Sequence, residues 1–459
     1  LHTAYRRQRQ MCIRDSIDTE QQITQKRKRC LSFIYYLFKS SLRKDEKKQR
    51  KVSEITVHLT TKTDHSTSIC MIYQYFMLTL HCHYQMRSTM RSRLFLLSII
   101  LLIGVSCQHK KATTEKETVA AGNTYTNPLL ERGAEPWAIF HEGKYYYTQG
   151  SENRVILWET DDITDLSHAT QKDVWIPTDP SNSYHLWAPE IHRINNKWYI
   201  YFAADDGNMD NHQIYVVENE AANPMEGTFV MKGRIQTDKD NNWAIHASTF
   251  EHDGQRYMIW CGWQKRRIDS ETQCIYIATM KNPWTLSSDR ILISKPEYEW
   301  ECQWVNPDGS KTAYPIHVNE APQYFESKNK DKACIFYSAS GSWTPYYCVG
   351  LLTADAKANL LNPASWKKSP VPVLQQDPEN NVYGPGGISF TPSPDGKEWY
   401  MLYHARQIPN DAPGASDSRS PRLQKIDWDK DGMPVLGTPQ KEEEPMARPS
   451  GSPIHKKQN

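Results

Sequence analysis

Two glutamates stand out in this chain because small residues and a proline hold each of them just before an expected strand. Glu135 lies in the segment Gly133–Trp137, and Glu320 lies in the segment Val318–Pro322. Two carboxyl groups that face each other across a pocket are what glycoside hydrolysis requires. One protonates the leaving oxygen, and the other activates a water or attacks directly. The alternative for either residue is a role as a salt-bridge partner or a turn acid.

A short polar turn runs into a strand rich in Tyr, Trp and Phe at five places. The five strands are Tyr145–Tyr147, Trp198–Phe202, Tyr257–Trp260, Ile335–Tyr337 and Trp399–Tyr403. Their spacing of roughly 50 to 80 residues is long for a solenoid and suits sheets arranged radially around an axis. The sequence therefore predicts an all-β fold, a five-bladed β-propeller over residues 125–440, whose inner strands would carry both glutamates to an axial pocket.

The charge distribution excludes few partners by itself. The 459 residues carry a net charge of +2, and basic residues are concentrated in the first ninety. A basic segment can bind nucleic acid, but this one has neither a fold pattern nor interleaved aromatic residues. The chain also has no glycine-rich phosphate loop and no zinc-spaced Cys/His cluster. We therefore expect no nucleic-acid partner and no metal-ligating residues.

The N-terminal part has the features of sequence that is absent from the mature protein. Residues 1–85 are expected to be a disordered, artefactual extension, because Arg6–Ser16 looks like the translation of a sequencing-library fragment. Residues 86–107 have a basic start and the apolar run Leu94–Val105, which at about twelve residues fits a signal peptide better than a membrane span. Cys107 follows small residues, as at a bacterial lipoprotein cleavage site, and predicts a lipid anchor in the periplasm or at the cell surface. The alternative is an ordinary signal peptide with Cys107 incidental.

Residues outside the propeller are polar, and the cysteines form no framework. Residues 108–124 are expected to be a tether and residues 441–459 a disordered tail. Five irregularly spaced cysteines remain after Cys107. An odd number at such spacing does not predict a disulfide framework. One disulfide could form, and the sequence does not say between which cysteines. These cysteines are Cys261, Cys274, Cys302, Cys334 and Cys348.

A set of motifs between Asn127 and Pro434 resembles glycoside hydrolase family 43. The motifs are Asn127–Leu130, Glu135–Trp137, His185–His192, Asn319–Pro322, Tyr383–Gly386 and Tyr403–Arg406. The resemblance implies a five-bladed propeller acting on arabinose- or xylose-containing polysaccharide, and the chain looks closest to the exo-acting α-L-arabinofuranosidase branch. It also implies a general base at Glu135 and a general acid at Glu320.

Three positions depart from the family pattern. The family's base is usually Asp, so Glu135 reaches further and narrows the gap of about 6.5–9.5 Å that an inverting enzyme needs. His246 replaces a second Asp that raises the pKa of the acid, whereas a cationic imidazole would lower it. We expect His246 to orient Glu320 through a hydrogen bond. Gly387 replaces a His that in relatives lies near an axial cation, so we expect no required cofactor and doubt a structural cation there.

Further residues of the motifs are candidates for sugar binding. Tryptophans could stack on sugar rings, although blade packing is the alternative use. Glu190, or Asp205-Asp206 after the second aromatic strand, could serve as a substitute carboxylate, and the alternative for Glu190 is a structural turn residue. The basic and imidazole groups could bind sugar hydroxyls or hold the axis in place. The candidates are Trp137, His185, Trp187, Glu190, Trp263, Trp343, His404 and Arg406.

These observations leave three functions open. The first is an inverting glycoside hydrolase, a monomer that cleaves terminal arabinofuranosyl or xylosyl residues with an altered set of acids. The second is a catalytically impaired surface protein that binds glycans on the same scaffold. The third is a structural or partner-binding propeller. Loss of turnover in Glu320→Gln would distinguish the hydrolase from the glycan-binding protein.

Overall fold

The computed structural model describes residues 123–453 apart from 152, 266–270, 307–315 and 412–415. The expected extension, signal segment and Cys107 lie outside these residues. Within the described part, helical structure is confined to short 3-10 turns: η1 (Leu166–His168), η2 (Pro180–Asn182), η3 (Met209–Asn211), η4 (Glu299–Glu301) and η5 (Pro363–Ser365). None of the helices in this part has the length and apolar character needed to cross a membrane.

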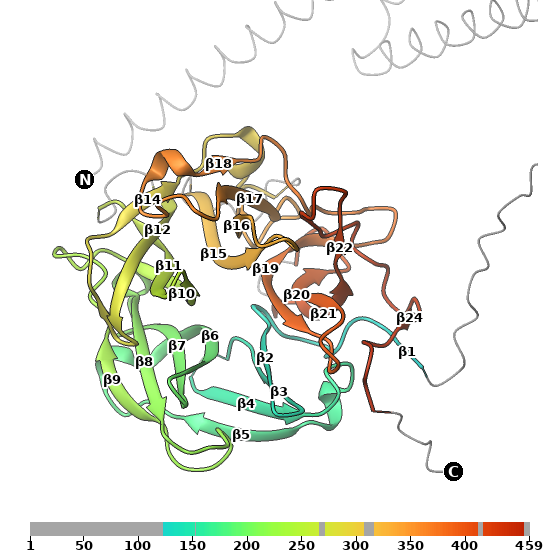
Figure 1. Cartoon of the computed structure of the whole chain (residues 1–459), viewed down its shortest axis with the longest axis horizontal. Helices are drawn as coiled ribbons and strands as arrows, with labels where there is room; N and C mark the ends of the chain where they lie inside the picture. Colours follow the sequence, from blue (N-terminus) through green and yellow to red (C-terminus); the bar gives the residue numbers. More distant parts are fainter. Residues whose placement is uncertain (1–122, 152, 266–270, 307–315, 412–415, 454–459) are drawn as a thin grey trace, which may run out of the picture. The chain divides into compact units, whose positions relative to one another are not determined.

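The strands form antiparallel sheets that follow one another around a centre, as Figure 1 shows. The first contains β2 (Trp137–His141), β3 (Lys144–Thr148), β4 (Val155–Thr160) and β5 (Thr170–Trp175), and the second β6 (Tyr184–Ile194), β7 (Lys197–Asp205), β8 (Gln213–Asn219) and β9 (Val230–Arg234). The third contains β10 (Ala244–His252), β11 (Gln255–Trp263), β12 (Glu271–Asn282), β13 (Thr285–Leu286) and β14 (Ile291–Ser294). The fourth contains β15 (Ile316–Glu326), β16 (Lys332–Ala339), β17 (Cys348–Asp355) and β18 (Lys367–Lys368), and the fifth β19 (Tyr383–Pro392), β20 (Trp399–Arg406) and β21 (Ser420–Lys425). A parallel pairing between β12 and β15 joins the third and fourth sheets, and the all-β propeller expected from the sequence is confirmed.

Each predicted turn and aromatic strand is the hairpin between the first and second strands of a sheet. Three of the turns place two consecutive residues at positive φ, namely Glu142-Gly143, Asn195-Asn196 and Asp253-Gly254. Turns of this kind match the right-handed twist of the strands they join. The aromatic side chains of the second strands are buried between neighbouring sheets, for example Trp198 and Tyr337, which are both 0% exposed.

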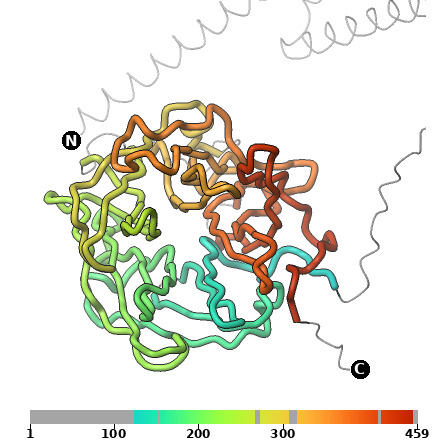
Figure 2. The backbone as a smooth tube through the Cα atoms, viewed as in Figure 1, coloured from blue at the N-terminus to red at the C-terminus, as the bar shows by residue number. Residues whose placement is uncertain are grey.

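The two ends of the described chain close the ring against the fifth sheet. Asn127 bonds both backbone groups of Leu423 in β21, and Leu129 donates its backbone N–H to Pro421. Beside them, β1 (Thr124–Tyr125) pairs with β24 (Met446–Ala447), and Figure 2 shows both termini of the domain on this side. A short sheet of β22 (Asp427–Trp428) and β23 (Pro434–Val435) follows the fifth sheet.

Part of the expected disordered tail is ordered. In addition to β24, Glu442 pairs with Arg422, and Arg448 pairs with Asp162. Arg422 is fully buried, so an acid from the tail is needed to satisfy its charge. Sequence composition did not predict this because the partners lie far away along the chain.

Each of the five sheets of the ring has a residue with positive φ in its first strand or just before it. Residues with positive φ interrupt or precede these strands at Glu135, Ala188, His246, Ala321 and Gly387. In the second to fifth sheets the pairing with the next strand shifts register at this point. Non-glycine residues seldom adopt this conformation, and bulges re-aim side chains. The repeated bulge turns selected side chains toward the centre of the ring.

Candidate active site

Glu135 is fixed by three hydrogen bonds. Its Oε2 accepts from the backbone N–H of Ala188 at 3.0 Å, and its Oε1 lies 2.9 Å from Nε2 of His246. Its own backbone N–H donates to Nδ1 of His404 at 3.0 Å. The carboxylate therefore has a defined position, held by residues from the second, third and fifth sheets.

His246 lies between the two glutamates. It occupies the bulge of β10 and is 4% exposed. Its Nδ1 lies 3.9 Å from Oε2 of Glu320 and has no hydrogen-bond partner. We expected His246 to orient Glu320, but its hydrogen bond goes to Glu135 instead, because the bulge turns Nε2 toward the first sheet.

Glu320 faces the other side of the imidazole ring. It precedes the bulge at Ala321 in β15, and its Oε1 accepts a hydrogen bond of 2.7 Å from the hydroxyl of Tyr347. Because a single imidazole ring bridges Glu135 and Glu320, their carboxyls are separated by at most the ring and its contacts of 2.9 and 3.9 Å. A limit of this kind admits both the separation of about 5–5.5 Å of retaining glycosidases and the window of about 6.5–9.5 Å of inverting ones.

The two glutamates differ in their affinity for a proton. Burial raises the pKa of Glu320, and this rise survives the opposing effects of His246 and Tyr347. Burial also acts to raise the pKa of Glu135, but the charge and hydrogen bond of His246 override it and lower that pKa to about 2. The pKa of His246 is itself raised: burial acts to lower it, but the attraction and hydrogen bond of Glu135 outweigh that effect. The pKa values of the two glutamates are thus shifted in opposite directions, as the separate roles of an acid and a base require.

Glu190 belongs to a group of polar side chains that hydrogen-bond one another. Glu190 accepts from Nε2 of Gln323 at 2.6 Å and lies 3.2 Å from Nε2 of His192. Ser248 in turn donates to Gln323 at 3.2 Å. Glu190 is 5% exposed, so this geometry favours its structural role over that of a substitute catalytic carboxylate.

The predicted sugar-stacking tryptophans divide between packing and partial exposure. Trp263 is 3% exposed and stacks on Trp243, with ring centroids 4.9 Å apart. Trp137 donates from Nε1 to the backbone oxygen of Ile191 at 2.8 Å. Of these, Trp137 keeps a partly exposed ring and Trp263 is part of the core.

The remaining candidates of the second sheet form one cluster. Trp187 stacks on His212 with ring centroids 4.0 Å apart. Nδ1 of His185 lies 2.9 Å from the buried carboxylate of Asp205, which is also 3.0 Å from Nδ1 of His212. The side chain of His185 is 31% exposed and Trp187 is half-buried, so both remain available to a ligand.

Trp343 and Arg406 donate their hydrogen bonds to other groups of the protein. Trp343 donates to the backbone oxygen of Trp304 at 2.6 Å. Arg406 is 3% exposed and donates to Asp411 at 3.1 Å and to the backbone oxygen of Ser342 at 2.8 Å. All of the hydrogen bonds of Arg406 described here are internal, which favours a structural role.

Position 387 has no room for a side chain that could hold an axial cation. A Cβ added at Gly387 would lie 2.5 Å from Cε1 of His404, and the residue has φ +56. Burial lowers the pKa of His404 well below its usual value, and the neighbouring charge of Arg419 lowers it further. The neutral His404 uses Nδ1 to accept from Glu135, so it supports the base.

Several residues at the site escaped prediction from the sequence. Tyr347 bonds Glu320, and Arg419 adds to the lowering of the pKa of Glu135 from a position beside Asp417. Cys261 lies close to both His246 and Glu320. No motif marks these residues, because each reaches the site from a different strand or loop; only the aromatic pair Tyr346-Tyr347 offered a signal.

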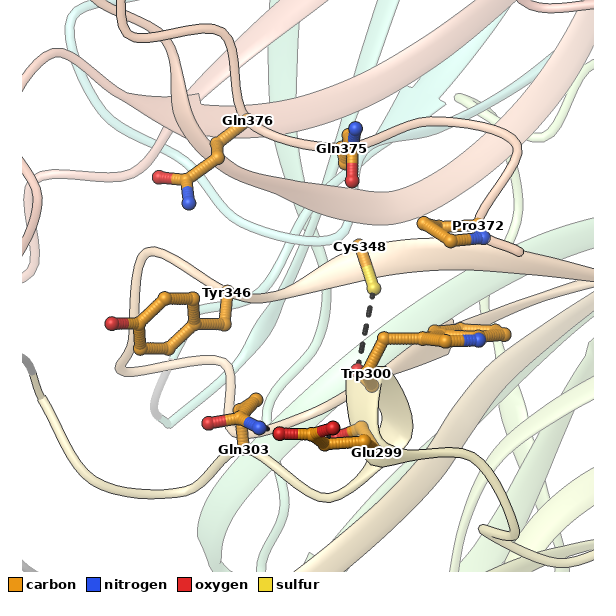
Figure 3. A pocket seen from close by; sticks show the side chains of 8 residues that line it. All are labelled: Glu299, Trp300, Gln303, Tyr346, Cys348, Pro372, Gln375 and Gln376. Atoms are coloured by element: carbon orange, nitrogen blue, oxygen red, sulfur yellow. Dashed lines mark hydrogen bonds between the residues drawn. The ribbon is translucent and has the colours of Figure 1, made fainter. Parts of the chain in front are cut away.

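A pocket of about 440 Å³ lies on the other side of the segment that carries Tyr347. Figure 3 shows it between η4, the start of β17 and residues 372–376, and its lining consists of Glu299, Trp300, Gln303, Tyr346, Cys348, Pro372, Gln375 and Gln376. Tyr346 and Cys348 line it, whereas Tyr347 between them reaches Glu320. The lining combines aromatic faces with amide groups, which suits a sugar ring.

A ring of five β-sheets with two glutamates on either side of a buried histidine at its centre, their pKa values shifted in opposite directions, defines a propeller of the glycosidase class. The chain belongs to glycosyl hydrolases family 43, whose sequence model matches residues 125–434.

Characterised relatives of the chain carry arabinofuranosidase names. The chain is 38% identical over 289 residues to an extracellular exo-α-(1→5)-L-arabinofuranosidase of Streptomyces chartreusis, which covers 62% of this chain and 83% of that protein. It is 37% identical over 323 residues to the protein of the same name from Streptomyces avermitilis, covering 69% of this chain and 64% of that protein. The crystal structure of an α-L-arabinofuranosidase from Lactobacillus brevis superposes with a TM-score of 0.63 at 31% identity, over 70% of this chain and 98% of that one. The chain therefore spans slightly less than two thirds of the length of the Streptomyces avermitilis protein.

Proposed function

We propose that this protein is an inverting glycoside hydrolase that removes terminal arabinofuranosyl or xylosyl-type residues from plant polysaccharide. The pair of glutamates on either side of His246 carries the proposal. Glu320 is the general acid, and Glu135 is the general base. The arabinofuranosidase names of its relatives support arabinose as the first sugar to test.

The proposed mechanism follows the opposite shifts of the two pKa values. Glu320, whose pKa is raised by burial, donates its proton to the leaving oxygen as the glycosidic bond breaks. Glu135, which is ionised, takes a proton from a water that attacks the anomeric carbon from the opposite face. Tyr347 holds one oxygen of Glu320 in place, so Oε2 is the oxygen available to carry the proton.

The second candidate function is glycan binding without turnover. It is favoured by the two hydrogen bonds on the carboxylate of Glu135 and by its pKa of about 2, since both weaken it as a base. A base works best when its pKa lies near the operating pH. Retention of sugar binding with no release of product would support this candidate.

The pocket beside η4 offers a second contact for a polymeric substrate. Trp300 lines it and is fixed by a 3.1 Å hydrogen bond from Nε1 to the backbone oxygen of Pro370. Trp300→Ala should weaken the binding of polysaccharide and leave turnover of a small aryl glycoside unchanged. An equal effect on both substrates would contradict this assignment.

We also propose that the protein is a monomer anchored outside the cytoplasm by a lipid on Cys107. The extracellular naming of the Streptomyces relatives supports an external location. Cys107→Ala should move the protein from the membrane fraction to the soluble fraction. An unchanged distribution would refute the anchor.

The hydrolase is tested by measuring free sugar released from 4-nitrophenyl furanosides and pyranosides, arabinan and arabinoxylan. Wild-type protein should release arabinose or xylose, and Glu320→Gln should not. Glu326→Gln, at the far end of the same strand, is the matched control and should retain activity. If no free sugar is released from any of the substrates, and both variants still bind sugar, the glycan-binding function would be favoured.

A further inference from the structure

Three neighbouring strands bring a histidine, a cysteine and a glutamate together at the centre of the ring. His246 comes from β10, Cys261 from β11 and Glu320 from β15, and one ligand atom of each lies within 4.8 Å of the others. All three residues are buried, and Cys261 is 0% exposed. The side chain of Glu320 keeps 10% exposure, so the cluster has contact with solvent.

The imidazole of His246 is arranged as in a metal-binding histidine. Its Nε2 is engaged with the carboxylate of Glu135 at 2.9 Å, while its buried Nδ1 has no hydrogen-bond partner. Metal-ligating histidines typically donate one ring N–H to a carboxylate, which fixes the tautomer and directs the other nitrogen at the metal. A buried nitrogen without a partner is costly, and a bound cation would remove that cost.

The other two donors each present a ligand atom to the cluster. The Oε1 atom of Glu320 is held by Tyr347, which leaves Oε2 facing the imidazole. Within the part of the chain that the structure describes, the thiol of Cys261 has a weak contact of 3.4 Å to Oε1 of Gln273 as its hydrogen bond. Ligands bind a metal in their deprotonated forms, so the cation displaces the protons of the thiol, of Nδ1 of His246 and of the Glu320 carboxyl, and all of them are released to solvent.

We propose that Nδ1 of His246, Sγ of Cys261 and Oε2 of Glu320 form a three-ligand site for a borderline-soft divalent cation such as Zn²⁺. Nitrogen, sulfur and oxygen donors of this kind are those that Zn²⁺ prefers, and three protein ligands leave one position for water or another ligand. In a tetrahedral site these donors lie about 3.3–3.6 Å apart. The present separations therefore require a contraction of about 1 Å, which rotation of the Glu320 and Cys261 side chains can supply.

Metal binding and acid catalysis exclude each other at this site. Glu320 bound through Oε2 cannot hold the proton that the leaving oxygen requires. Zn²⁺ should therefore inhibit turnover, and a chelator should restore it. This consequence rests on the proposed hydrolase function, whereas metal binding itself does not.

The test is titration of the full chain with Co²⁺, which substitutes for Zn²⁺ and reports its ligands by absorption. We expect visible bands of tetrahedral cobalt and a sulfur-to-cobalt charge-transfer band in the near ultraviolet, both removed by an equivalent of Zn²⁺. Cys261→Ser should lose the charge-transfer band, and His246→Asn should weaken cobalt binding at least tenfold. Cys334→Ser, a buried cysteine in another cluster, is the matched control and should keep every band.

The outcomes are distinct from those of the hydrolase assay, since no sugar is present. A wild-type protein without the charge-transfer band, or a band that persists in Cys261→Ser, would overturn the site. Should Cys261→Ser fail to fold, Zn²⁺ still tests the site by raising the melting temperature of wild type more than that of His246→Asn. Equal rises in both proteins would equally refute it.

Discussion

Replacing His246 by asparagine removes a charge between the acid and the base while keeping a hydrogen-bond donor. The imidazolium and the Glu320 carboxylate are 3.9 Å apart, so two unit charges there attract by about 4 kcal/mol at an effective dielectric constant of about 20. The positive charge of the imidazolium is shared between its two ring nitrogens, so we assign half of this attraction, about 2 kcal/mol, to the nitrogen that faces Glu320. This amount corresponds to about a thirtyfold change in the proton affinity of Glu320.

The sign of the effect is the same for both glutamates. Burial raises the pKa of Glu320 and His246 opposes that rise, so Glu320 of the variant keeps its proton to higher pH. The pKa of Glu135, which His246 lowers to about 2 against the effect of burial, rises as well. Both limbs of the bell-shaped profile of kcat/KM against pH should therefore move to higher pH.

The assay is hydrolysis of an aryl arabinofuranoside by wild type and His246→Asn across the pH range. His252→Asn is the matched control, because His252 is a buried histidine of the same strand whose partners are Tyr324 and the backbone of Ala356. The control should lose stability and keep the wild-type profile. An alkaline limb that stays in place, or moves to lower pH, in His246→Asn would refute the electrostatic reasoning.

Three further substitutions test individual contacts. Tyr347→Phe removes the 2.7 Å hydrogen bond to Glu320 and should lower kcat about tenfold, since such a bond contributes about 1.5 kcal/mol or more; an unchanged kcat would contradict its positioning role. Arg406→Ala removes the buried cation that Asp411 and Asp417 share. In urea titrations it should lower the free energy of unfolding by about 3 kcal/mol. A change in sugar affinity alone would instead show a binding role. Gly387→Ala forces a Cβ against a neighbouring imidazole at positive φ and should lower stability by about 1–3 kcal/mol in the same titrations, and wild-type stability would contradict the close approach.

The fold was predictable because its signal is local. A polar turn and an aromatic strand are contiguous in sequence, so the hairpins at Glu142-Gly143 and Asp253-Gly254 could be recognised one by one. The positions of Glu135 and Glu320 were predictable for the same reason, since each lies in a short motif.

The contacts of the site were not predictable, because bulges and strand packing determine them. The positive φ of His246 decides that its Nε2 meets Glu135 and its Nδ1 faces Glu320. Cys261 reaches the same point only because β11 pairs with β10. Spacing along the chain therefore carried no sign of the histidine–cysteine–glutamate cluster.

The central claim is that Glu320 donates a proton to the leaving group, and substrates with different leaving groups test it most directly. A 2,4-dinitrophenyl leaving group needs little protonation, whereas a sugar leaving group needs a full proton transfer. We predict that Glu320→Gln keeps most of its turnover on the dinitrophenyl glycoside and loses at least a hundredfold on arabino-oligosaccharide. Equal losses on both substrates, or no turnover of either by wild-type protein, would contradict the account.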